Sequence, residues 1–171
     1  MKPVYLLTGR PGSGKTSLVK QVVARIPGQA GGFYTEEIRT GGVREGFRLV
    51  TLDGETAILA HIKIHSPHRV GKYGVDVEAL ERVGVPALER AAQHGALVVI
   101  DEIGRMELFS PRFRETVTQV ITSGKKVLGT IMLNPNPFAD AIKRQPNVNL
   151  LTVTRDNYEL VLAELLRWVE L

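Results

Sequence analysis

The sequence predicts an α/β fold built on a mixed, mainly parallel sheet, and three stretches carry that prediction. A strand-like run, a glycine-rich loop and a helical pattern follow one another within residues 4–25. A second apolar run, residues 96–102, ends in two acids, which is typical of a buried parallel strand whose carboxyl end faces a site. Residues 32–60 instead show the pattern of consecutive antiparallel strands. We therefore expect a parallel sheet extended by a β-meander.

The loop at residues 9–16 matches the phosphate-binding pattern G-x-x-x-x-G-K-[ST] at every fixed position. Its glycines allow a tight turn, and its N–H groups and the following helix N-terminus favour an anion. We predict that Lys15 reaches the β- and γ-phosphates and acts in catalysis, and that the Thr16 hydroxyl binds Mg²⁺. The residues expected to contact a nucleoside triphosphate here are Gly9, Arg10, Pro11, Gly12, Ser13, Gly14, Lys15 and Thr16. A chance glycine-rich turn is the alternative, and the strand and helix around the loop argue against it.

Composition narrows the class of protein. A chain of 171 residues predicts one domain spanning residues 1–171. No run of about eighteen apolar residues occurs, so we expect no membrane span. The absence of cysteine excludes disulfides and thiolate chemistry and favours a cytoplasmic location. The net charge of +4 leaves nucleic acid open as a partner, but no block of basic residues supports it, and the oligomeric state is undetermined.

The meander prediction rests on turn residues. A Thr-Gly-Gly segment and an Asp-Gly pair separate three strand-like runs, and such short turns join antiparallel strands. The strands are expected at residues 32–39, 43–52 and 55–60. We expect this meander to join the edge of the sheet.

Residues 61–76 show no sustained period, and we predict a loop. Three of the four histidines lie within residues 61–72, but no carboxylate occurs in that stretch, so solvated histidines are favoured over a metal site. Residues 77–94 then predict two short helices divided near Gly84 and Pro86, with Gly95 ending the second.

The acids that end the run at residues 96–102 are the second chemical landmark. In a protein with a phosphate loop, an apolar strand ending in Asp supplies a Mg²⁺ contact, and we assign that role to Asp101. Glu102 is then placed to orient or deprotonate a water that attacks the γ-phosphorus. The alternative is a solvent-exposed strand end without chemistry.

The remaining pattern continues the alternation of helix and strand. Ser110 and Pro111 begin a helix that ends at Gly124, and a strand at residues 127–133 leads to Asn134. We predict that Asn134 senses the γ-phosphate or holds the attacking water, although Asn-Pro is also a turn signal. The last elements are expected at residues 138–144 (helix), 148–153 (strand) and from about residue 156 (helix).

The segment Asp101-Glu102-Ile103-Gly104-Arg105-Met106-Glu107-Leu108 resembles the second nucleotide motif of the THEP1-type nucleoside-triphosphatases, which are small RecA/AAA-like P-loop proteins. Residues 32–39, 44–47, 50–54 and 70–75 resemble the same family. The resemblance implies a three-layer sandwich, Mg²⁺-dependent hydrolysis of nucleoside triphosphates with broad base tolerance, and a catalytic glutamate beside the aspartate. Arg105 stands where the family often has Lys, and it is predicted as a further catalytic residue because arginine can bind phosphate bidentately.

The function that follows is hydrolysis of ATP, GTP, CTP and UTP to the diphosphate and phosphate. Low base selectivity is expected because no Asn-Lys-x-Asp-type guanine-reading segment follows the later strands. Two alternatives stay open: a small-molecule or nucleotide kinase that uses the same loop, and a nucleotide-gated module that binds nucleic acid. The sequence does not decide whether Arg10, Arg105 or Arg112 supplies a charge-neutralising finger.

Overall fold

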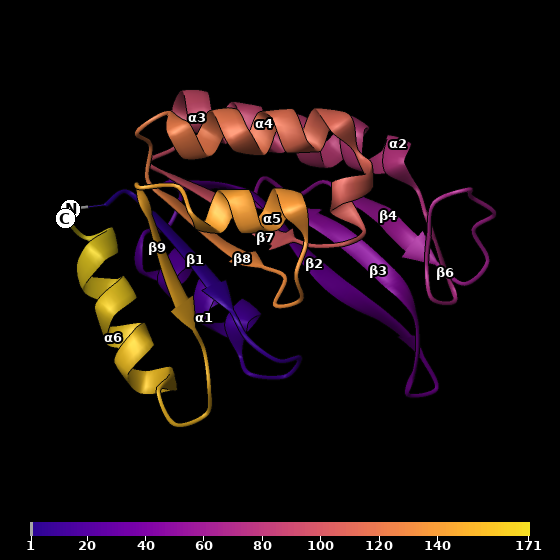
Figure 1. Cartoon of the computed structure of the whole chain (residues 1–171), viewed down its shortest axis with the longest axis horizontal. Coiled ribbons are helices and arrows are strands. Elements are labelled where there is room, and N and C mark those ends of the chain that lie inside the picture. The colour runs from indigo at the N-terminus through magenta and orange to yellow at the C-terminus, as the bar shows by residue number, and fades with distance from the viewer. Residues whose placement is uncertain (1) are drawn as a thin grey trace.

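The computed structural model describes residues 2–171, and helices cover both faces of one continuous sheet (Figure 1). The sheet order is β5-β6-β4-β3-β2-β7-β8-β1-β9. The strands are β1 (Val4–Thr8), β2 (Ala30–Thr40), β3 (Val43–Thr51), β4 (Thr56–His61), β5 (Arg69–Val70), β6 (Tyr73–Val75), β7 (Leu97–Ile103), β8 (Val127–Ile131) and β9 (Val148–Thr152). The helices are α1 (Lys15–Arg25), α2 (Val77–Ala79), the π-helical η1 (Leu80–Gly84), α3 (Val85–His94), the 3₁₀-helix η2 (Glu107–Phe109), α4 (Pro111–Thr122), α5 (Pro137–Lys143) and α6 (Tyr158–Val169).

The predicted α/β three-layer sandwich is confirmed, because each face of the sheet has its own apolar core. On one face α1 and α6 pack on β1, with Trp168 edge-on to Tyr5 at 4.9 Å between ring centroids. On the other face lie α3, α4 and α5, where Phe113 of α4 meets Phe33 of β2 at 6.3 Å. Each fully buried large apolar side chain contributes about 1.5–3 kcal/mol, so both cores hold the sheet rigidly.

The parallel part of the sheet places the chemistry. Strands β2, β7, β8, β1 and β9 run parallel, so their carboxyl ends share one edge. Only β8 separates β1 from β7. The loop after β1 therefore lies close to the acids at the end of β7, where the pairing of β7 with β8 is interrupted between Ile100 and Ile103. Ligands of open α/β sheets bind at such an edge.

The meander is confirmed as three antiparallel strands, β2, β3 and β4. Gly41 and Gly42 form the two-residue turn between β2 and β3 with φ of 58° and 79°, the conformation that such hairpins need. Its first strand also pairs in parallel with β7, so β2 belongs to both parts of the sheet. The meander thus continues the sheet directly from the strand beside the acids.

The loop predicted at residues 61–76 is wrong in part. It contains β5 and β6, a small hairpin that turns at Gly71, where φ is 57°. Strand β6 pairs with β4 and buries Tyr73 and Val75. Strands of two and three residues are too short to show a period in the sequence. They form because β6 pairs with β4 and β5 pairs with β6, so the sequence pattern missed them.

The predicted break between two helices near Gly84 is also wrong. The chain stays helical from Val77 through α3, and Gly84 has helical angles of φ −71° and ψ −48°. The N–H of Val85 donates to the carbonyl of Leu80, five residues earlier. This wider turn accommodates Pro86, which lacks an N–H group, and the helix therefore continues through it. Within residues 2–171, no helix has the length and apolar character needed to cross a membrane.

Candidate active site

The phosphate loop, residues 9–16, is held tightly against the β9–α6 connection. Gly9 and Gly14 have φ of 150° and 97°, and both positions lack room for a side chain. A Cβ at Gly9 would lie 2.7 Å from the carbonyl oxygen of Val153, and one at Gly14 would lie 2.7 Å from the ring of Tyr158. The loop needs glycine at these positions for its turn and for its packing.

Two polar groups of the loop are placed for an anion. The ammonium group of Lys15 donates to the carbonyl of Gly9 at 2.6 Å and so curls over its own loop. The Ser13 hydroxyl is buried and has no hydrogen-bond partner among the described residues. Since buried polar groups are normally paired, an unpaired hydroxyl beside a lysine favours a ligand that accepts hydrogen bonds.

Asp101 is the centre of a hydroxyl network. It is only 4% exposed, and its two carboxylate oxygens accept hydrogen bonds from Thr16 at 2.8 Å and from Thr130 at 2.7 Å. Its backbone carbonyl accepts a third from Thr35 at 2.6 Å. Burial raises the pKa of Asp101, and the hydroxyls of Thr130 and Thr16 act in the opposite direction. The predicted pair of Thr16 and Asp101 is thus brought together, with Thr130 of β8 as a partner that sequence reasoning missed.

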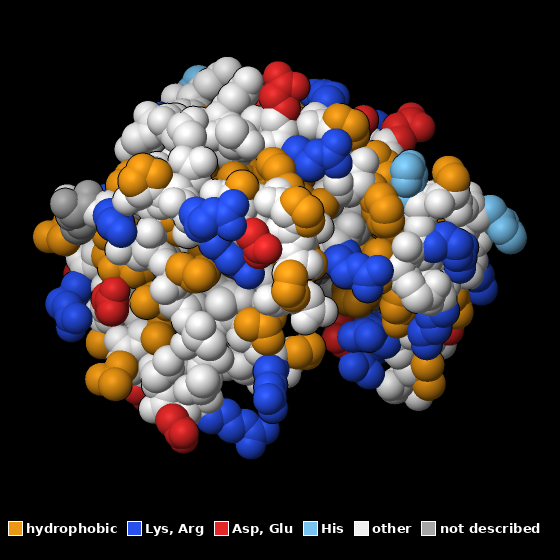
Figure 2. Space-filling model, in the orientation of Figure 1, with side chains coloured by type: hydrophobic (Ala, Val, Ile, Leu, Met, Phe, Trp, Pro, Cys, Tyr) orange, Lys and Arg blue, Asp and Glu red, His pale blue; other side chains and the backbone are white. Residues whose placement is uncertain are grey.

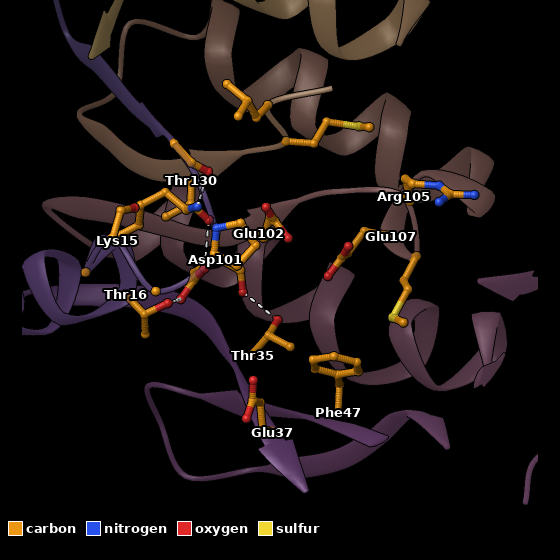
Figure 3. A pocket seen from close by; sticks show the side chains of 18 of the residues that line it. Lys15, Thr16, Thr35, Glu37, Phe47, Asp101, Glu102, Arg105, Glu107 and Thr130 are labelled. Carbon is orange, nitrogen blue, oxygen red and sulfur yellow. Dashed lines mark hydrogen bonds between the residues drawn. The ribbon is translucent and has the colours of Figure 1, made fainter. Parts of the chain in front are cut away.

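Glu102 follows Asp101 and lines the same cavity as the phosphate loop. Its pKa is raised by burial and by the charge of Asp101, while Lys15 lowers it. In Figure 3 the side chains of Glu102 and Glu107 both extend into this cavity. Glu107, on η2, is 3% exposed and was also missed, although it lies within the segment that resembles the family motif. The carboxyl groups of Asp101, Glu102 and Glu107 therefore line one cavity together with Lys15.

We expect Glu107→Gln to stabilise the protein without nucleotide at pH 8. Burial and the charge of Glu102 raise the pKa of Glu107 well above its usual range. The folded state therefore holds this proton more tightly than the unfolded state, and the stability from this group is lost as pH rises through the folded pKa. Glutamine removes the charge, so the melting temperature at pH 8 should rise by about 2–4 °C for each kcal/mol of repulsion removed.

Melting curves of both proteins from pH 5 to pH 8 measure this effect. The gap between them should widen with pH, and Glu115→Gln on the exposed side of α4 serves as the control with no expected change. A melting temperature of Glu107→Gln below that of the wild type at pH 8 would contradict the electrostatic account.

The cavity has a volume of about 570 Å³ and two unlike sides. One side is the phosphate loop with Asp101 and Glu102. The other is a wall from the meander and the β5–β6 hairpin, which we call the meander wall: Thr35, Glu37, Arg44, Phe47 and Val70. The face seen in Figure 2 is notched between these two sides of the molecule, and Lys and Arg side chains lie on both flanks of the notch.

The meander wall was missed for a geometric reason. Side chains three apart in a regular strand point to opposite faces, so simple alternation does not place Arg44 and Phe47 together. The pairing of β2 with β3 skips Glu45, because Arg39 pairs with Arg44 while Ile38 pairs with Gly46. Such a bulge shifts the alternation by one residue and brings Arg44 and Phe47 to the same face. The signal available in the sequence was the family resemblance of residues 32–39 and 44–47.

The other predicted residues are placed differently. Asn134 lines the cavity from its exposed rim. Arg105 also lines it, but its guanidinium points away from the acids in Figure 3. Arg10 lines a second cavity of about 550 Å³, together with its neighbours in the phosphate loop, Leu133 and the β9–α6 turn. Arg112 contacts the Glu81 carbonyl and Glu89 and lines neither cavity.

Comparison with known proteins decides the family. A family model described as NTPase matches residues 4–166. The chain belongs to this NTPase family. It is 48% identical over 161 residues to the nucleoside-triphosphatase THEP1 of Thermotoga maritima, covering 94% of this chain and 92% of that protein. The predicted resemblance to THEP1-type NTPases is thereby confirmed.

Two solved structures of this NTPase family have the same fold. The crystal structure of THEP1 from the hyperthermophile Aquifex aeolicus matches with a TM-score of 0.91 at 38% identity, over 98% of this chain and 99% of that one. The solution structure of a human cancer-related nucleoside triphosphatase matches with a TM-score of 0.83 at 36% identity, over 99% and 98%. The meander is included in these matches, because they extend over nearly the whole chain.

Proposed function

We propose that this chain is a Mg²⁺-dependent nucleoside-triphosphatase that releases phosphate from ATP, GTP, CTP and UTP with little base selectivity, and that residues 1–171 act as one domain. The observation that carries the proposal is the position of Glu102. Its carboxylate lines the same cavity as Lys15 of the phosphate loop and directly follows Asp101. A carboxylate at this place can accept a proton from water beside the terminal phosphate.

The residues present fit Mg²⁺. The Thr16 hydroxyl and the Asp101 carboxylate are oxygen donors 2.8 Å apart, and hard cations prefer oxygen. No group of three or more His, Cys, Asp or Glu within residues 2–171 could hold a metal by itself. Such a sparse donor set suits an ion that also binds substrate phosphates and keeps several waters. When bound, Mg²⁺ supplies positive charge to the β- and γ-phosphates.

The protein side chains perform the remaining tasks. Lys15 exchanges its contact with the Gly9 carbonyl for phosphate oxygens, and the N–H groups of the loop hold the β-phosphate. Glu102 orients the water and accepts its proton as the oxygen–phosphorus bond forms. Asn134, on the rim of the cavity, is retained as a γ-phosphate contact. Arg105 keeps its predicted catalytic role only if its side chain turns inward.

Low base selectivity is supported by the second cavity. It is lined by the phosphate loop, by Leu133 and by residues 152–155, and its two charged residues are Arg10 and Arg155. Guanidinium groups stack on any base, whereas selective reading needs a fixed donor and acceptor pair. The nearby amide of Asn157 is already used within its turn, by the N–H of Thr154 and the carbonyl of Thr152.

We therefore expect kcat/KM for ATP, GTP, CTP and UTP to agree within about tenfold, which is about 1.4 kcal/mol. Parallel steady-state assays on one preparation measure this directly. A preference of several hundredfold for one base would show that a selective base site exists.

One assay tests the proposed function against its alternatives. The protein is incubated with ATP and Mg²⁺ alone, and free phosphate is measured. Phosphate release by the wild type that is lost in Glu102→Gln supports the hydrolase. Transfer that begins only when a hydroxyl-bearing acceptor is added would show a kinase, and nucleotide binding with neither reaction would show a binding module.

A further inference from the structure

We propose that Arg44 of β3 contacts the γ-phosphoryl group in the transition state and supplies, within the same chain, the positive charge that an arginine finger provides. The inference rests on the proposed hydrolysis and adds a catalytic residue to it. Arg44 lines the cavity from the meander wall, on the opposite side from the phosphate loop. A triphosphate held by the loop directs its terminal phosphate toward Asp101 and Glu102, which line the same cavity as the meander wall.

The guanidinium of Arg44 is held in place before any ligand binds. Its Nε donates to the hydroxyl of Tyr73 at 2.9 Å, and its Nη1 donates to Glu37 at 3.3 Å. It also lies over the rings of Phe47 and Tyr73, at 5.2 and 5.7 Å from their centroids. The remaining nitrogen, Nη2, forms no hydrogen bond to a described residue. Because the planar group is fixed on three sides, little conformational entropy is lost when Nη2 meets a phosphate oxygen.

The charge of Arg44 is only partly neutralised. Glu37 receives a shorter bond from Arg39, at 2.7 Å, than from Arg44, at 3.3 Å. Both arginines lower the pKa of Glu37, which therefore stays ionised. The guanidinium groups of Arg39 and Arg44 exceed the single carboxylate of Glu37 by one positive charge, and Arg44 is the arginine of this cluster that lines the cavity.

The other arginines considered for this task are placed less well. Arg10 lines the second cavity, and Arg112 is held by Glu81 and Glu89 away from both. Arg105 lies on the rim with its guanidinium directed away from the acids in Figure 3. Arg44 alone among these four lines the main cavity and is also oriented by hydrogen bonds in the described structure.

The chemical step shows what Arg44 contributes. A bond forms between the water oxygen and the γ-phosphorus, the bond from that phosphorus to the bridging oxygen breaks, and the water proton passes to Glu102. The electron pair of the broken bond stays on the diphosphate, and charge is spread over the γ-oxygens. A guanidinium aimed at these oxygens stabilises the transition state more than the ground state, so it should act on kcat.

Arg44→Ala is therefore expected to lower kcat by roughly 10²-fold, while the Kd for labelled ATP changes by less than about threefold. This is below the range of about 10³–10⁵ for arginine fingers, because Glu37 shares the charge. Single-turnover hydrolysis and equilibrium binding measure the two effects. Methylguanidinium added to Arg44→Ala should restore part of the rate. The matched control is Arg48→Ala, four residues along β3 and exposed outside the cavity, which should behave as wild type.

Three further measurements keep the proposal open to refutation. Arg44→Lys is the second variant in case Arg44→Ala is unstable. It keeps the positive charge but lacks the planar guanidinium with its paired N–H donors, so it should fold and retain an intermediate rate. Tyr73→Phe removes the acceptor of the Arg44 Nε and a longer bond to the Arg44 carbonyl at 3.5 Å, and it should lower kcat by a few-fold. Wild-type activity per molecule should not depend on protein concentration. Wild-type kcat in Arg44→Ala or Arg44→Lys, no rescue by methylguanidinium, or a rate that rises with concentration would overturn the assignment. A wild-type protein that releases no phosphate would instead remove the proposed function.

Discussion

Glu102→Gln is expected to bind nucleoside triphosphate normally and to hydrolyse it roughly 10²–10⁴ times more slowly, the usual range for a positioned general base. Glutamine keeps the size of the side chain but cannot accept the proton of the water. The proposed function assigns phosphate binding to residues 9–16 and metal binding to Thr16 and Asp101, so affinity should change little. The variant should accumulate as a complex with the intact triphosphate.

The structure also predicts how Glu102→Gln affects stability, so the test does not depend on activity alone. The pKa of Glu102 is raised by burial and by Asp101, so replacing it with a neutral group removes a repulsion and should not destabilise the fold. If Glu102 were only a strand-end carboxylate that holds the backbone, the variant would melt earlier and keep its chemistry. Single-turnover hydrolysis, binding of a labelled triphosphate and a melting curve on one preparation separate these outcomes, and wild-type turnover would refute the catalytic role.

Lys15→Ala is expected to lose affinity and turnover together, with kcat/KM falling by roughly 10³-fold, or about 4 kcal/mol. Lys15 meets phosphate charge both in the bound substrate and in the transition state, so KM should rise and kcat should fall. In the free protein it makes a hydrogen bond to the Gly9 carbonyl at 2.6 Å, whose loss costs about 0.5–1.5 kcal/mol of stability.

A control on the same helix isolates this effect. Lys20 of α1 forms an exposed ion pair with Glu36 at 3.5 Å and lies outside the cavity. Because exposed pairs contribute about 0–1 kcal/mol, Lys20→Ala should have nearly wild-type stability and kinetics. Normal kinetics in a folded Lys15→Ala protein would remove the assignment of residues 9–16 as the phosphate site.

The parts of the site that could be predicted from sequence are those built from consecutive residues. A phosphate loop binds through neighbouring N–H groups, so residues 9–16 contain nearly the whole proposed anion site in one stretch. Asp101 and Glu102 were predictable because a buried parallel strand delivers its last residues to the functional edge of the sheet. The meander was predictable from its turn residues, since hairpin turns need particular backbone angles.

The residues that only the tertiary structure revealed depend on pairing between distant segments. The skipped residue Glu45 decides which face Arg44 occupies. The Tyr73 hydroxyl, on the β5–β6 hairpin, accepts the hydrogen bond from Nε that orients the Arg44 side chain. The burial of Glu107 depends on how η2 packs after β7, and no local sequence pattern predicts that packing. A cytoplasmic location and the catalytic role of Arg105 stay predictions.

The sequence by itself therefore determined the proposed phosphate site of this protein, because local backbone conformation and strand order specify where the loop and the two acids lie. Only the tertiary structure decided which side chains line the cavity opposite the phosphate loop. The wall opposite the loop is assembled from β2, β3 and the β5–β6 hairpin, and one bulge sets its composition. Strand register is a property of paired chains, and a shift of one residue turns a side chain to the other face of the sheet.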